Sequence, residues 1–188
     1  RSNDYQVELP SGTVDVKVVF IENYVVEEYS SYTTWGTSRT GGWAEKESNT
    51  LFCNLGAYDV NTEKFKMSYL KHETVHFVDL NKYENLSSAD LEYRAKLIEL
   101  MHCTELSIYD RAAEFIAGAS ADDRSYSHPY ANYCIVKDFS KILFDSEYET
   151  DFSKWKQCSV KQINDAATIL FQQNTETLDK DPTLQKVI

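Results

Sequence analysis

The sequence predicts an α+β fold in which strands come first and helices follow. Near the N-terminus, apolar residues alternate with polar ones, which is the pattern of a strand with one buried face. From about residue 61 the apolar residues recur at helical spacing instead. The chain shows no repeat and no clear linker, and its length suits one well-packed domain. We therefore expect a single domain over residues 1–188, with strands and loop over 1–60 and helices over 61–188.

Two strands and an intervening loop are predicted in the first part. TVDVKVVFI at 13–21 alternates and is rich in valine, which indicates a strand. The polar stretch 30–50 holds three of the six glycines and is typical of a loop or a hairpin rim. TLFCNLGAYDV at 50–60 predicts a second strand, in which Gly56 would form a bulge.

Five helices are predicted in the second part. The first covers 61–83. The second follows Ser87, which forms a capping box with Asp90, while Leu86 and Leu91 can form a hydrophobic staple around the cap. It should end near residue 104, and further helices are expected at 107–119, 129–144 and 159–177.

Composition limits the partners and the environment. The net charge of −11 argues against binding to a nucleic-acid backbone, and no apolar run is long enough for a membrane span. A chain that begins at Arg1 is expected from a trimmed mature form or a fragment, and we expect a secreted or periplasmic location. The chain has four cysteines, and none of them form a CxxC pair: Cys53, Cys103, Cys134 and Cys158. We expect either two disulfides, in one of three pairings, or buried free thiols.

The sequence KHETVHF at 71–77 predicts a metal site. On a helix, His72 and His76 lie on one face, one turn apart, and can bind a single ion. Glu73 lies about 100° around the helix from His72 and can reach a water bound to that ion. This is the H-E-x-x-H arrangement of two zinc ligands and a general base. Two unrelated helix histidines are the alternative.

A di-iron site is a second alternative. Glu73-x-x-His76 is followed by Glu99-x-x-His102, and paired E-x-x-H motifs are typical of carboxylate-bridged di-iron bundles. The strands predicted in the first part leave few long helices for such a bundle. A di-iron site would also give no role to His72.

The third zinc ligand distinguishes the families that share H-E-x-x-H. Asp79 and Lys82 stand where metzincins have a glycine and a third histidine, so that class is excluded. With HETVH at 72–76 and DLEYRAKL at 90–97, the chain resembles the gluzincin metallopeptidases over roughly residues 40–100. The second motif is similar to the E-x-x-A portion of a gluzincin glutamate helix. Lys96 departs from the aspartate that many gluzincins have at this position.

The resemblance implies a zincin-like fold and a Zn²⁺ cofactor. Glu92 would be the third ligand, one turn into the capped helix, with Glu99 as the rival. Asp79 lies close enough on its helix to accept from the His76 imidazole, and Arg94 is a candidate partner for Asp79 or Glu73.

The resemblance also implies a peptide or protein substrate. Glu73 would be the base. Candidates for a second donor to the oxyanion lie in SYSHPYANY at 125–133, with His128 foremost and Tyr126, Tyr130 and Tyr133 beside it. Zincins bind an extended peptide along a sheet edge, which would here involve residues 40–54, with Gly41 and Gly42 permitting close approach and Trp43 lining a subsite. A packed tryptophan in a simple hairpin is the alternative. We expect a zinc metallopeptidase, or else a zincin-like binding or regulatory protein with little proteolysis.

Overall fold

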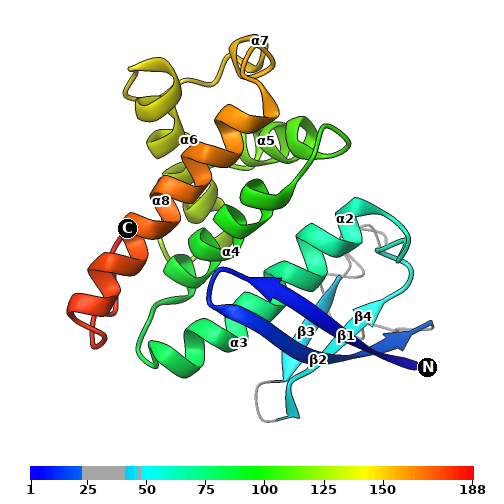
Figure 1. Cartoon of the computed structure of the whole chain (residues 1–188). Helices are drawn as coiled ribbons and strands as arrows, with labels where there is room; N and C mark the ends of the chain where they lie inside the picture. Colours follow the sequence, from blue (N-terminus) through cyan, green and yellow to red (C-terminus); the bar gives the residue numbers. More distant parts are fainter. Residues whose placement is uncertain (23–40, 46–47) are drawn as a thin grey trace. The chain divides into compact units, whose positions relative to one another are not determined.

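Residues 1–22, 41–45 and 48–188 are described by the computed structural model shown in Figure 1. They fall into two compact units, Arg1–Phe77 and Val78–Ile188, and each unit is described by itself. The order of elements confirms the predicted α+β class, since a four-stranded mixed sheet precedes the helices. The prediction of one domain stays a prediction. Of the loop predicted at 30–50, residues 30–40 and 46–47 lie outside the described ranges.

The sheet of the first unit contains β1 (Ser2–Leu9), β2 (Gly12–Ile21), β3 (Gly42–Glu45) and β4 (Thr50–Asn54), in the spatial order β1-β2-β4-β3. β1 and β2 form an antiparallel hairpin, β2 and β4 run parallel, and β3 pairs antiparallel with β4. Gly12 follows the hairpin turn with a φ of 124°, which a residue with a side chain rarely adopts. Among the described strands, β1 and β3 are the two edges of this sheet.

The alternation in β2 produces the buried face that the sequence predicted. Val16, Val18 and Phe20 are buried, and the residues between them are more exposed. β1 was not predicted, and it buries only Val7 and Leu9. β4 is buried over most of its length.

One continuous helical segment follows the strands, in place of the single α-helix predicted at 61–83. It consists of the short α2 (Glu63–Phe65), the π-helix η2 (Lys66–Lys71) and α3 (His72–Lys82). Phe65 is buried at the centre of an aromatic cluster that comprises Tyr5, Phe20, Tyr58 and Tyr69. This cluster packs the segment onto the sheet of the same unit.

The second unit is helical and is built around α4 (Ser88–His102), which is buried over most of its length and packs against α6 (Ser127–Phe144) and α8 (Val160–Lys180). Ser87 is the N-cap of α4, as predicted, and its hydroxyl oxygen accepts from the Asp90 N–H. The backbone N–H of Ser87 donates to the Gln185 carbonyl at 2.9 Å. The remaining helices are α5 (Ile108–Ala117) and the short α7 (Phe152–Trp155), which was not predicted.

None of the helices in the described ranges combines the length and the apolar character that a membrane crossing requires.

Candidate metal centre

The helical segment that carries HETVH changes its winding immediately before the motif. In η2 the hydrogen bonds are π-helical, and the backbone N–H of His72 donates to the carbonyl of Met67, five residues earlier. Regular α-helix begins at His72. Stretches of π-helix are rare in proteins, and those that occur often lie at functional sites. The first histidine of the motif therefore lies at a change of helical register.

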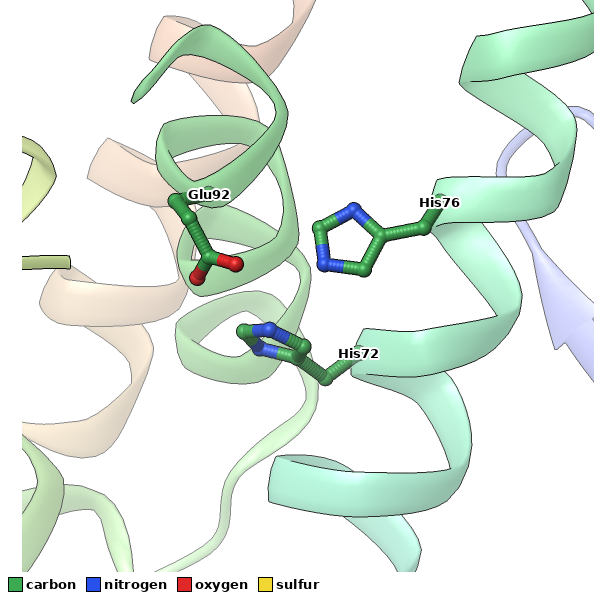
Figure 2. A group of neighbouring side chains, drawn as sticks. All are labelled: His72, His76 and Glu92. Atoms are coloured by element: carbon green, nitrogen blue, oxygen red, sulfur yellow. The ribbon is translucent and has the colours of Figure 1, made fainter. Parts of the chain in front are cut away.

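The two histidines project from the same side of α3, as their spacing predicted (Figure 2). Their ring centroids are 4.9 Å apart and their planes cross at 86°. His72 is buried, and His76 and Glu73 are half-buried. The pair is thus withdrawn from solvent, which is not expected of two unrelated surface histidines.

Glu92 lies one turn after the Ser87 cap of α4. Its side chain is 12% exposed, and its Oε2 lies 2.9 Å from Nδ1 of His128. Lys96, one turn further along α4, is buried. Burial lowers the pKa of the Lys96 ammonium, and the nearby carboxylates of Glu99 and Glu92 act in the opposite direction. Two basic side chains therefore accompany the Glu92 carboxylate.

Three side chains form a candidate metal-binding group. One ligand atom from each of His72, His76 and Glu92 lies within 4.8 Å of the others (Figure 2). Imidazole nitrogen and carboxylate oxygen are zinc ligands, and in a tetrahedral site they would stand about 3.3 Å apart. The donor types therefore fit zinc. Within the described ranges this is the one group of three or more such residues.

Asp79 is bound by Arg94, one of the partners that the sequence offered. Nε of Arg94 donates to one oxygen of Asp79 at 2.7 Å and Nη2 donates to the other at 3.0 Å. Nη1 donates to Oδ1 of Asn174 at 2.8 Å, so the guanidinium joins α3, α4 and α8 within the second unit. The Asp79 carboxylate thus serves a helix-to-helix ion pair.

Glu99, the rival third ligand, is buried beside a different partner. Its Oε2 lies 2.8 Å from Nε of Arg111, whose side chain is 12% exposed. His102, which completes the second E-x-x-H, places Nδ1 3.0 Å from the Ile98 carbonyl oxygen. In the part of the chain that the structure describes, neither residue belongs to a candidate metal group. This arrangement offers no support to the di-iron alternative.

The glycines and tryptophan predicted at the substrate edge have partners inside the first unit. Trp43 stacks on Phe52 with ring centroids 4.9 Å apart and planes at 9°. A Cβ on Gly42 would lie 2.5 Å from the Tyr69 ring, and one on Gly41 would lie 2.9 Å from the Tyr58 ring. The close approach that these glycines permit is therefore made by the protein's own tyrosines. Substrate binding at β3 stays a prediction.

All four cysteines are buried free thiols, so the disulfide alternative is wrong for this structure. Burial raises the pKa of Cys53 and of Cys134 to about 11. These two thiols are held in the unreactive, protonated form at neutral pH.

Two features of the site were not predicted from the sequence. The π-helix before His72 was one of them, because no simple sequence pattern predicts it. The approach of His128 to Glu92 depends on how α6 docks on α4. The Pro129 that follows His128 did indicate a helix start, and α6 begins at Ser127.

No protein-family model, curated protein or solved structure matches this chain. Its function is therefore inferred from its own side chains.

Proposed function

We propose that the chain is a zinc-dependent hydrolase of the gluzincin type that cleaves peptide bonds. His72, His76 and Glu92 would hold the zinc ion, and Glu73 would be the general base. The observation that carries the proposal is the gathering of Glu92 with both imidazoles of an H-E-x-x-H helix. Three protein ligands of these types, with one coordination position left for water, are the usual composition of a catalytic zinc site.

The chemistry assigns a separate task to Glu73. Zinc bound by the three ligands would lower the pKa of a coordinated water toward neutrality and polarise the substrate carbonyl. The Glu73 carboxylate would accept the proton that the water loses on attacking the carbonyl carbon, and would then deliver it to the leaving nitrogen. Its half-buried position beside His72 suits a base that must stay close to the ion without binding it.

Substitution Glu73→Gln tests the base. We expect turnover of peptide substrates to fall by at least about 100-fold, because the amide cannot accept the proton. Zinc content, measured by elemental analysis, should stay at one ion per chain. Glu84→Gln is the matched control, since Glu84 is exposed beyond the end of α3. Full activity in Glu73→Gln would exclude the proposed role.

Substitution Glu92→Ala tests the third ligand. Loss of a partner behind a ligand typically costs 10–100-fold in metal affinity, so we expect loss of the ligand itself to cost more than about 100-fold. Zinc affinity is measured by competition with a chromophoric chelator, and Glu105→Ala, an exposed glutamate, is the control. An unchanged zinc affinity in Glu92→Ala would show that the third ligand is another residue. Two irons per chain would favour the di-iron alternative.

A screen of peptide libraries separates the hydrolase from a zincin-like binding protein. The hydrolase should cleave a subset of peptides in a zinc-dependent way. A wild-type protein that holds one zinc and cleaves none of them would support the binding role instead.

A further inference from the structure

His128 touches the proposed glutamate ligand from a neighbouring helix. It is the second residue of α6, and its Nδ1 lies 2.9 Å from Oε2 of Glu92. The His128 side chain is 65% exposed, whereas that of Glu92 is 12% exposed. The sequence predicted His128 as a donor to the oxyanion, but this contact places it beside a ligand carboxylate.

The backbone that carries His128 is fixed to α4 on both sides of the contact. Four residues before it, the Arg124 guanidinium binds the Asp90 carboxylate, which is fully buried. Further along α6, the Tyr93 hydroxyl donates to Asp138 at 2.8 Å. The imidazole is therefore held against α4 although most of its surface is open to solvent.

We propose that His128 is a positioning residue that attracts one oxygen of Glu92 so that the other oxygen faces the metal. The inference rests on the proposed function, because it takes Glu92 as a zinc ligand. A ligating carboxylate is commonly held by a second group, and loss of that group typically costs 10–100-fold in metal affinity. His128 acts through Glu92 and needs no contact with substrate.

The test measures zinc affinity and turnover separately. We expect His128→Ala to raise the Kd for zinc by about tenfold or more, in competition with a chromophoric chelator and without any peptide present. His128→Gln, which keeps an N–H donor, should recover part of that loss. Tyr126→Ala is the matched control, because Tyr126 is similarly exposed at 68% and lies two residues earlier. At saturating zinc, His128→Ala should regain the wild-type kcat and KM.

Four results would overturn the inference or separate it from the proposed function. A wild-type zinc Kd in His128→Ala overturns the positioning role. A reduced kcat that persists at saturating zinc also overturns it, because His128 would then act on the substrate. If the wild-type protein binds zinc but hydrolyses no peptide, the hydrolase proposal fails. The ratio of the zinc Kd of His128→Ala to that of the wild type still decides the role of His128. If the wild-type protein takes up no zinc, both proposals fail.

Discussion

Arg94 and Asp79 form a buried ion pair whose loss should cost much of the stability of the second unit. Their side chains are 3% and 2% exposed, and both Asp79 oxygens accept from the guanidinium. The guanidinium carbon also lies 4.3 Å from the Phe171 ring centroid and 5.4 Å from that of Tyr83. Arg94→Met keeps an apolar stem between these rings but leaves the Asp79 carboxylate buried without its cation.

The expected loss of stability in Arg94→Met follows from the burial of the ion pair. Removing one partner of a buried pair costs about 3–5 kcal/mol, because the remaining charge is desolvated and uncompensated. The total free energy of unfolding of a typical domain is only about 5–15 kcal/mol. The pair Lys82–Asp179 is the control, since it also joins α3 to α8 within the second unit but its side chains are 51% and 46% exposed. Lys82→Met should cost about 0–1 kcal/mol.

The assay is urea unfolding followed by far-UV circular dichroism, which reports chiefly on the helices of the second unit. We expect the midpoint to fall much further in Arg94→Met than in Lys82→Met. The double variant Asp79→Leu/Arg94→Met should recover part of the loss, because it removes the stranded charge. The reasoning is refuted if Arg94→Met costs no more than Lys82→Met, or if the double variant is less stable than Arg94→Met.

Two further predictions concern the first unit and the thiols. In Gly42→Ala the new Cβ would lie 2.3 Å from the Phe52 carbonyl oxygen and 2.5 Å from the Tyr69 ring, so we expect a loss of about 1–3 kcal/mol in thermal unfolding; an unchanged melting temperature would contradict this packing. Because burial raises the pKa of Cys53 and Cys134 to about 11, their thiolates are scarce at pH 8 and increase as the pH rises toward 11. Ellman's reagent should therefore label them slowly in the native protein and rapidly in denaturant, and rapid native labelling at pH 8 would show that they are accessible.

Local signals account for the parts of the fold that the sequence predicted. Ser87 caps α4 because its own side chain satisfies a backbone N–H, and this chemistry can be recognised within a few residues. β2 shows its alternation directly because one face is buried. β1 has only two buried apolar residues, so its period-two pattern was too weak to detect. The π-helix of Lys66–Lys71 was missed because a spacing rule for α-helices does not include a change of winding.

In the candidate site, too, the features set by neighbouring residues could be predicted, and those set by contacts between helices could not. His72, Glu73 and His76 are near neighbours in the sequence, so their shared helix could be predicted from spacing alone. Glu92 and Glu99 both lie on α4, and spacing could not separate them. In the structure the two differ in their partners, since Arg111 approaches Glu99 from the next helix, α5. Contacts between helices of this kind cannot be predicted from one sequence.

The wide turns of η2 let a single stretch of backbone meet two angular requirements at once. Phe65 and Tyr69 must face the aromatic cluster, while the imidazoles one and two turns later must share another direction. In a uniform α-helix, the angle between these two directions would be fixed by the rotation of about 100° per residue. Shortening Lys66–Lys71 by one residue would swing both imidazoles around the helix axis by about that angle, yet leave their mutual spacing intact. The orientation of the histidine pair is thus set upstream of the motif, by residues that bear no ligand atom.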